Sequence, residues 1–213
     1  TMKYSFKGNS AIVSGGGSGI GEATARLLAA NGVQVVVSDI DLEAARCVVK
    51  AIDAAGGRAV AHAGNTTRPD DAQAAVQCAL EHFGALHLAF NNAGISGTIK
   101  PAGEMAADEW QHVIDVNLSG VQYALRAQIP AMLDAGGGAI VNMSSILGLV
   151  GSATAPAYVA AKHGVTGLTR SAALAYAAHG IRINSIHPGY IDTPLLKVLD
   201  EATLAALKGM HAI

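Results

Sequence analysis

The sequence is poor in charged and aromatic side chains. Only 14% of its 213 residues are Asp, Glu, Lys or Arg, 4% are aromatic, and the net charge is -2. It contains no run of basic residues, so it lacks the positive footprint of a nucleic-acid-binding protein. It also contains no run of about 18 apolar residues, which excludes a transmembrane helix. We therefore expect neither a nucleic acid nor a membrane as a partner.

Signals for export and for metal binding are equally scarce. Residues 2–8 lack the apolar core that a signal peptide needs. The two cysteines, Cys47 and Cys78, lie far apart and show no paired-cysteine spacing, which favours a reducing, cytoplasmic setting. The 8 histidines show no spacing typical of metal ligands. We therefore expect no metal site.

Glycine and alanine dominate what the chain does contain, and short β-branched runs alternate with long alanine-rich stretches. Repeated strand–helix units indicate a parallel sheet with helices on both faces. We expect a single Rossmann-like, doubly wound α/β domain over residues 1–213. The expected strands are 11–13, 33–37, 58–62, 86–90, 139–143 and 181–186, and the expected helices are 20–31, 41–55, 69–83, 104–134 and 156–178.

A glycine-rich turn follows the first expected strand and opens the first helix. Gly15, Gly19 and Gly21 stand in GxxxGxG spacing. Without side chains the backbone can approach a pyrophosphate closely, and the helix N-terminus offers free N–H groups to the anion. Two other phosphate loops do not fit, because Glu22 stands in place of the Walker lysine and GxGxxG lacks its third glycine. The remaining alternative is a glycine turn without a ligand.

An acidic residue, Asp39, ends the second expected strand, 18 residues after Gly21. A carboxylate at this position can accept hydrogen bonds from both hydroxyls of an adenosine ribose, and it would repel a 2′-phosphate. No Lys or Arg occurs at residues 14–21 or at position 40 to compensate that repulsion. The sequence therefore favours NAD over NADP. The alternative role of Asp39 is a cap for the helix that starts near Asp41.

A tyrosine and a lysine form a candidate catalytic pair. Tyr158 and Lys162 lie four residues apart at the start of an alanine-rich helix, so their side chains share one face. Ser144 and Ser145 directly follow the strand expected at 139–143. Ligands of open α/β sheets bind at the carboxyl edge of the strands, where the glycine turn also opens. We expect these residues to meet there.

Taken together, these motifs resemble the short-chain dehydrogenase/reductase family in their order and spacing. The resemblance covers essentially the whole chain, and the motifs are far more specific jointly than singly. The motifs that carry it are the glycine turn, Asn91-Asn92-Ala93-Gly94, Asn117, Ser145, Tyr158-x-x-x-Lys162 and Pro188-Gly189.

The resemblance implies catalytic roles. Tyr158 would be the general acid/base, and Lys162 would lower the pKa of its phenol and hold the nicotinamide ribose. Ser145 would polarise the substrate oxygen, whereas the neighbouring Ser144 is expected to be structural. Hydride would pass between nicotinamide and the substrate carbon while Tyr158 moves the proton.

Asn117 lies among poor helix formers, residues 115–120, inside a long helical stretch. Such a local inconsistency indicates a functional position, and the alternative is an exposed polar turn of helix. By resemblance, Asn117 anchors a water that relays protons to Lys162.

The resemblance also implies a set of NAD contacts. Asn65 stands where the family usually has an aspartate, and its amide oxygen can still accept from the adenine amino group. Ser14 keeps the hydroxyl of the more common threonine. His163, beside Lys162, occupies a different helix face and is not expected to act as a base. The expected contacts are Gly15, Ser18, Gly19, Ile20, Gly21, Asp39, Asn65, Thr66, Asn91, Ala93, Gly94, Tyr158, Lys162, Pro188, Gly189, Ile191 and Thr193.

The function predicted from these features is an NAD-dependent oxidoreductase that acts on a secondary alcohol or ketone. Apolar residues expected around the substrate favour a hydrophobic or cyclic skeleton. Two alternatives are a catalytically silent NAD-binding regulatory protein and an epimerase or lyase on the same fold, but the intact Ser145, Tyr158 and Lys162 favour redox chemistry. The residues expected at the substrate are Ile95, Ser96, Leu147, Tyr190 and 195–199.

Two expectations concern assembly and the chain end. Low charge and alanine-rich helix faces at 104–134 and 156–178 favour a homodimer or homotetramer paired through these helices. Residues 194–213 carry periodic leucines and are expected to form a helical substrate lid. Family members usually continue with another helix and a seventh strand. We therefore expect that the final strand is missing here and that the sequence is part of a longer polypeptide, the alternative being a natural short form.

Overall fold

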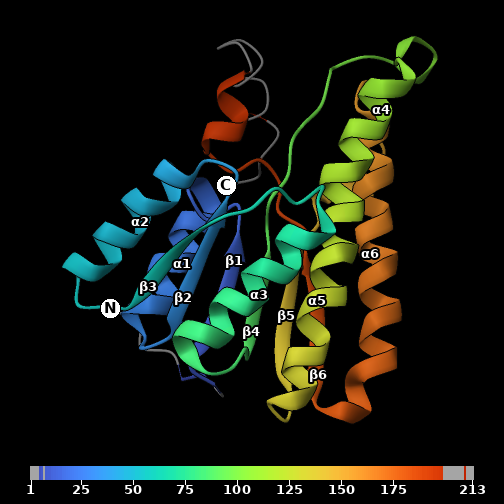
Figure 1. Cartoon of the computed structure of the whole chain (residues 1–213). Coiled ribbons are helices and arrows are strands. Elements are labelled where there is room, and N and C mark those ends of the chain that lie inside the picture. The colour runs from blue at the N-terminus through green and yellow to red at the C-terminus, as the bar shows by residue number, and fades with distance from the viewer. Residues whose placement is uncertain (1–4, 7, 199–208, 210–213) are drawn as a thin grey trace.

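The computed structural model describes residues 5–6, 8–198 and 209 and contains a parallel sheet in the order β3-β2-β1-β4-β5-β6 (Figure 1). The strands are β1 (Ser10–Ser14), β2 (Gln34–Asp39), β3 (Ala59–Ala63), β4 (Leu88–Asn91), β5 (Gly138–Met143) and β6 (Ile181–Ile186). The α-helices are α1 (Gly19–Ala30), α2 (Leu42–Ala54), α3 (Pro69–Phe83), α4 (Ala107–Ile114), α5 (Gly120–Asp134) and α6 (Pro156–Tyr176). The predicted doubly wound α/β fold is confirmed.

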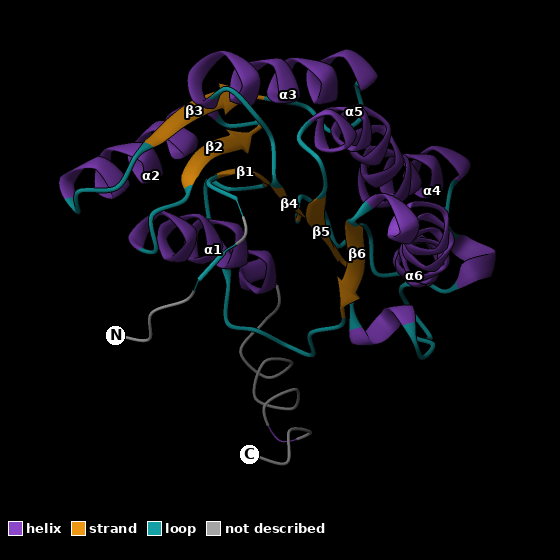
Figure 2. Ribbon diagram, turned by 90° about the horizontal axis from the view of Figure 1, so that it is seen from below, coloured by secondary structure: helices purple, strands orange, loops and turns teal. Residues whose placement is uncertain are grey.

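The central strands are apolar because helices cover both of their faces. In β2, Val35, Val36 and Val37 are fully buried. Helices α1 and α2 pack on one face of the sheet, and α3, α5 and α6 pack on the other (Figure 2). Side chains of alternating strand residues enter two separate cores, one on each face. This layering holds the strand ends, and the loops that follow them, in fixed positions.

The path of the chain places a crevice at the carboxyl edge of the sheet. Strand β1 pairs with β2 on one side and with β4 on the other, so the strand order reverses between β1 and β4. Ligands of open α/β sheets bind at such a reversal. Between β4 and α4 the chain rises above this edge, as Figure 1 shows.

The structure corrects the helix expected at 104–134. A short 3₁₀ turn, Ala102–Glu104, precedes α4, and a π-helical turn at Asp115–Ser119 separates α4 from α5. The helix expected at 156–178 ends at Tyr176. The lid expected at 194–213 begins with a 3₁₀ turn, Pro194–Val198, and most of its remainder lies outside the described residues.

The two sides of the sheet are not equally covered. Strand β6 pairs only with β5, and Arg182, Asn184 and Ile186 on one face of β6 are exposed in the described part of the chain. None of the helices described is long and apolar enough to cross a membrane.

Candidate active site

The glycine turn between β1 and α1 is shaped by close backbone contacts. Gly15 and Gly19 have φ angles of 60° and 53°, which other residues rarely adopt. A Cβ on Gly21 would lie 1.9 Å from the Gly15 carbonyl oxygen, so no other residue fits there. The first turn of α1 is thereby packed against the loop, with its free N–H groups at the crevice. This cradle suits a pyrophosphate.

The carboxylate of Asp39 lies against this turn. Its Oδ2 accepts a hydrogen bond from the Gly17 N–H at 2.8 Å, and its Oδ1 accepts one from the Asp41 N–H at 3.0 Å. Asp41 itself caps α2 by accepting from the N–H groups of Glu43 and Ala44. The capping role is therefore filled by Asp41, and Asp39 is held at the end of β2 beside the turn.

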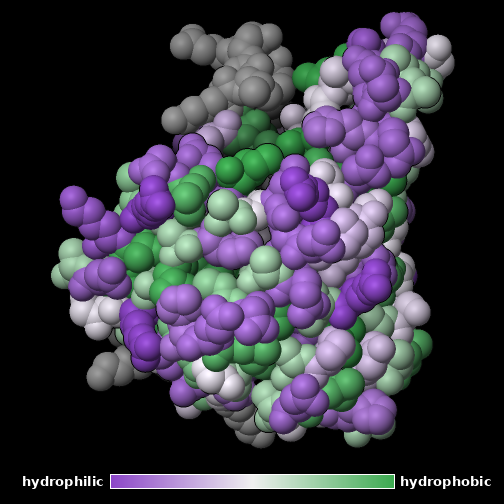
Figure 3. Space-filling model, in the orientation of Figure 1, coloured by the Kyte–Doolittle hydropathy of each residue, from purple (hydrophilic) through white to green (hydrophobic). Residues whose placement is uncertain are grey.

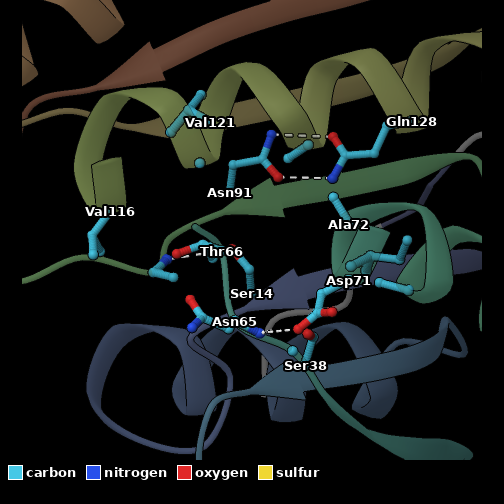
Figure 4. A pocket seen from close by; sticks show the side chains of 16 residues that line it. Ser14, Ser38, Asn65, Thr66, Asp71, Ala72, Asn91, Val116, Val121 and Gln128 are labelled. Carbon is cyan, nitrogen blue, oxygen red and sulfur yellow. Dashed lines mark hydrogen bonds between the residues drawn. The ribbon is translucent and has the colours of Figure 1, made fainter. Parts of the chain in front are cut away.

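A cavity of about 40 Å³ lies between the sheet and the helices α3 and α5 (Figure 4). Asn65, Thr66 and Ala93, all predicted cofactor contacts, line it together with Val116. The Asn65 side-chain oxygen accepts from both the N–H and the hydroxyl of Thr67, at 3.0 and 2.8 Å. The oxygen expected to meet adenine is thus already used to shape the loop after β3.

Four buried polar side chains join the sheet to α5 and α6, and two of them, Asn91 and Gln128, also line this cavity. The amides of Asn91 and Gln128 exchange two hydrogen bonds, of 2.8 and 3.1 Å (Figure 4). Asn91 also donates to Asn142, which in turn donates to Thr169 at 3.0 Å. All four residues are buried. Asn91 therefore has a structural role inside the sheet, and the cluster holds the end of β4 against α5.

Lys162 is the most deeply buried cation of the site, with 2% of its surface exposed. Its ammonium donates to the Met143 carbonyl at the end of β5 at 2.8 Å. It lies 5.4 Å from the ring centre of Tyr158, one helical turn earlier. Burial disfavours the charged form and lowers the pKa of Lys162 to about 8. Burial thus moves the titration of the lysine toward neutral pH, although the charged form still prevails at pH 7.

Tyr158 faces Ser145, as the spacing predicted. Burial raises the pKa of the Tyr158 phenol, and a side-chain hydrogen bond with Ser145 opposes that rise. The lowering of this pKa by Lys162 stays a prediction. Lys162 bonds to the Met143 carbonyl, and burial is the largest influence on the phenol. Ser145, itself buried, also accepts from the Leu147 N–H and caps the short helix after β5.

Asn117 occupies the π-helical turn and is fully buried. Its side-chain amide pairs with the backbone of Ile95, accepting from the N–H at 2.9 Å and donating to the carbonyl at 2.8 Å. A Cβ on Gly94 would lie 2.7 Å from Asn117 Oδ1 and 3.6 Å from Lys162 Nζ. The irregular helix predicted here is present, and the glycine lets Asn117 and Lys162 lie near the same stretch of backbone.

Two neighbours of the candidate catalytic residues make other contacts. The Ser144 hydroxyl donates to the Lys162 carbonyl at 2.9 Å, in the buried contact between β5 and α6. The exposed His163 ring lies over its own helix, with Nδ1 3.0 Å from the Val159 carbonyl oxygen. Both arrangements agree with the predictions that Ser144 is structural and that His163 points elsewhere.

The segment after β6 closes the site beside the glycine turn. The Pro188 carbonyl accepts from the Ile146 N–H at 2.8 Å, which ties this segment to the serine loop. Thr193 packs on the turn, since a Cβ on Gly19 would lie 3.3 Å from its own Cβ. Ile191 is 46% exposed on this segment. The predicted nicotinamide contacts therefore lie between the serine loop and the phosphate cradle.

Some partners in the site could not be read from the sequence. The carbonyl of Met143 and the backbone of Ile95 act through main-chain atoms, which carry no residue signature. Val116 lines the cavity, and its only signal was its position next to Asn117. His187 bonds to the Ser145 carbonyl through its ring, and nothing in its spacing indicated that contact.

Comparisons with known proteins agree with this geometry. The family described as short chain dehydrogenase matches residues 9–203. The chain is 56% identical over 206 residues to cyclohexanol dehydrogenase of Acinetobacter sp. (strain SE19), covering 97% of this chain and 82% of that protein. It is 45% identical over 208 residues to cis-4-hydroxycyclohexanecarboxylate dehydrogenase of Sinomonas cyclohexanicum, covering 96% of this chain and 83% of that protein.

Solved structures show the same fold. The crystal structure of levodione reductase superposes with a TM-score of 0.89 at 35% identity, covering 94% of this chain and 81% of that one. The predicted resemblance is confirmed over nearly the whole chain. The protein is therefore a member of the short-chain dehydrogenase/reductase family, whose dehydrogenases are oxidoreductases that use a nicotinamide cofactor.

Proposed function

We propose that the protein is an NAD-dependent dehydrogenase that interconverts a secondary alcohol on a cyclic skeleton and the corresponding ketone. The observation that carries this proposal is the grouping of Ser145, Tyr158 and Lys162 at the carboxyl edge of the sheet, beside the glycine cradle. These groups can bind an alcohol oxygen, move its proton and orient a ribose. None of them supplies a redox centre, which a nicotinamide cofactor would provide by accepting or donating the hydride.

The proton of the alcohol would pass to Tyr158. Ser145 would donate a hydrogen bond to the substrate oxygen, which fixes that oxygen next to the phenol. Lys162 would hold the nicotinamide ribose hydroxyls. Its charge, 5.4 Å from the ring centre, would favour the phenolate once the ribose draws it away from Met143. Both ends of the Asn117 side chain are engaged with Ile95, so a relay water at Asn117 would be held by its main chain.

The preference for NAD rests on Asp39. Its carboxylate lies at the end of β2, hydrogen-bonded to Gly17 in the cradle. A 2′-phosphate at the adenosine ribose would meet this charge, and no Lys or Arg lies in the cradle segment 14–21 or at position 40 to offset it.

A cyclic substrate is supported by relatives and by the rim of the site. Cyclohexanol dehydrogenase and cis-4-hydroxycyclohexanecarboxylate dehydrogenase are named for alicyclic alcohols. Here Tyr190, Leu195 and Leu149 leave 38%, 43% and 52% of their surfaces exposed on the loops beyond β5 and β6. Figure 3 also shows hydrophobic residues gathered at the upper centre of the face of the molecule that it displays. These surfaces suit a hydrocarbon ring, and residues 194–213 would cover it as a lid.

A homodimer or homotetramer completes the proposal. Its interface would be formed by α4, α5 and α6, where Trp110, Leu133 and Leu174 are 39%, 39% and 85% exposed in the described part of the chain. An oligomer would bury these apolar surfaces. Light scattering at micromolar concentration should then give two or four times the chain mass, and a monomer would contradict this part.

The direct test is the formation of NADH, followed by its absorbance, with matched cyclic and open-chain secondary alcohols. We expect cyclohexanol to be oxidised with a kcat/KM at least about tenfold above that of 2-hexanol, and NAD to be preferred over NADP. Turnover of no alcohol, together with tight NAD binding, would instead indicate a silent NAD-binding protein. Equal use of both cofactors would overturn the role given to Asp39.

A further inference from the structure

The loops that follow β5 and β6 stay bonded to each other beyond the sheet. The Ser144 N–H donates to the Ile186 carbonyl at 3.0 Å, and the Ile146 N–H donates to the Pro188 carbonyl at 2.8 Å. These bonds continue the parallel ladder of β5 and β6, whose last paired residues are Met143 and Ile186. The serine loop and the segment after β6 are therefore joined by backbone hydrogen bonds on both sides of Ser145.

One rung of this ladder cannot form. In a parallel ladder, the residue that accepts from Ile146 would also donate its own N–H to the Ser144 carbonyl. That residue is Pro188, which has no N–H. The contact between the two loops is therefore short of one backbone donor at the point where the serine loop turns away from the sheet.

The imidazole of His187 does not replace that donor at Ser144 but bonds to the next carbonyl, that of Ser145, which also accepts from the Gly148 N–H at 2.8 Å. Its Nδ1 lies 3.1 Å from the Ser145 carbonyl oxygen, and its Nε2 lies 3.0 Å from the Ser185 hydroxyl. A carbonyl oxygen can only accept, so Nδ1 carries the proton, and in the neutral ring Nε2 accepts from Ser185. One side chain thus bonds to the backbone of the serine that faces Tyr158.

We propose that His187 is a positioning residue that fixes the catalytic serine relative to the segment that holds the nicotinamide. This inference rests on the proposed function. In it, the Ser145–His187 hydrogen bond sets the distance between the substrate oxygen and the cofactor. Ser145 sets the position of the oxygen, and residues 188–193 continue directly from His187 along the cofactor side. The bond lies between the two, so its loss changes their separation rather than the chemistry of either.

The expected consequence falls on turnover and not on cofactor affinity. Hydride transfer needs the two carbons at a near-attack distance, and a displacement of about 1 Å can cost about 100-fold in rate. The glycine cradle and Asp39 belong to β1, α1 and β2, and the segment after β6 reaches the cradle only at Thr193, six residues after His187. We expect kcat to fall while the dissociation constant for NAD stays within about threefold.

The test compares two variants of His187 whose side-chain amides reach the positions of different imidazole nitrogens. His187→Asn places its amide nitrogen where Nδ1 lies and can still donate to the Ser145 carbonyl. His187→Gln reaches the Nε2 position instead, and His187→Leu removes both groups. With cyclohexanol we expect His187→Asn to retain kcat within about threefold. His187→Gln and His187→Leu should lose about 10- to 100-fold, with a larger primary isotope effect for cyclohexanol deuterated at the carbinol carbon.

Two results would overturn the assignment: wild-type kcat in His187→Gln, or an equal loss in His187→Asn and His187→Gln. Should His187→Leu fail to fold, the two amides still decide the question, since their melting temperatures can be compared directly. Tyr158→Phe is measured alongside them. If that variant turns over like wild type, the proposed function fails. If it is inactive while His187→Gln is unimpaired, only the role of His187 fails.

Discussion

The two halves of the sheet edge are built on different principles. In the nucleotide half, formed by β1–β3 with α1 and α2, backbone geometry makes the site: glycines with positive φ, helix N–H groups and a half-exposed carboxylate. In the catalytic half, formed by β4–β6 with α4–α6, buried side chains make it. Lys162 and Asn117 are 2% and 0% exposed, and each is held by main-chain atoms of another element.

The difference follows from what each half has to do. An anion can be bound by backbone dipoles that are already part of the fold, with no buried side-chain charge. Proton transfer depends on the pKa values of the groups involved, and burial shifts them here in opposite senses relative to neutral pH: it lowers the pKa of Lys162 and raises that of Tyr158. The catalytic half therefore contains a desolvated ammonium that lowers the stability of the fold. Substitutions that remove this charge should raise the unfolding free energy and lower the activity.

Replacement of Lys162 should have the largest effect, because it should change stability and activity in opposite directions. Lys162→Met keeps the length of the side chain but removes the charge, the ribose contact and the support of the phenol. We expect kcat/KM to fall by about 1,000-fold. The unfolding free energy at pH 7 should rise by about 1–3 kcal/mol, because a buried charge is replaced by an apolar group. Steady-state kinetics and chemical denaturation test both parts, and a destabilised Lys162→Met would contradict the account.

The nucleotide half should respond to a change in backbone space. Gly21→Ala places a Cβ 1.9 Å from the Gly15 carbonyl oxygen. Relieving that overlap should cost about 1–3 kcal/mol and weaken NAD binding by about 10- to 100-fold. Gly167→Ala in α6 is the matched control, because its Cβ would meet no atom within 4 Å. Titration calorimetry should show unchanged NAD affinity for the control; similar affinities in both variants would count against a backbone-built cradle.

The charge of Asp39 should set cofactor choice with a smaller effect. Asp39→Asn keeps an oxygen that can accept from the Gly17 N–H but removes the repulsion of a 2′-phosphate. The ratio of kcat/KM for NAD to that for NADP should fall by about tenfold. The two cofactors are compared on one cyclic alcohol, and an unchanged ratio would show that the carboxylate is not the discriminating group.

The buried lysine should also leave a signature in stability against pH. Its folded pKa of about 8 lies below the ordinary value of 10.5, so between these values the unfolded chain binds a proton that the native protein does not. Stability contributed by this group therefore rises from pH 8 to 10, by about 2 kcal/mol relative to Lys162→Met.

Above pH 10 the raised pKa of Tyr158 acts in the opposite direction, because the native protein then holds the extra proton. The measurement is urea unfolding of wild type and Lys162→Met at several pH values. A constant difference in unfolding free energy between the two proteins from pH 8 to 10 would contradict the shift.

The sequence predicted the nucleotide half more completely than the catalytic half. Glycine spacing and a strand-terminal acid are local signals, and the turn, Asp39 and the parallel strands follow from them. The Tyr158–Lys162 spacing is also local, but the groups that hold these residues come from distant segments. The sequence gives no sign that Met143 offers its carbonyl to Lys162, or that the Asn65 oxygen is used by Thr67.

The π-helical turn at Asp115–Ser119 is a second feature that the sequence predicted only in part. Weak helix formers there predicted an irregularity, but a single helix over 104–134 was the expectation. The Asn117 amide at the break pairs with the backbone of Ile95, 22 residues earlier in the chain. Contacts of this range depend on the topology of the sheet and not on the neighbouring residues.

The central claim is that the catalytic half carries the chemistry and the nucleotide half carries the binding, and Tyr158→Phe tests it most directly. The ring remains in place and only the transferable proton is lost. With NAD and cyclohexanol, we expect kcat to fall by at least about 100-fold, while the dissociation constant for NAD, measured by fluorescence titration, stays within about threefold. A Tyr158→Phe enzyme with near-wild-type kcat, or one that loses NAD affinity in parallel with turnover, would contradict the account.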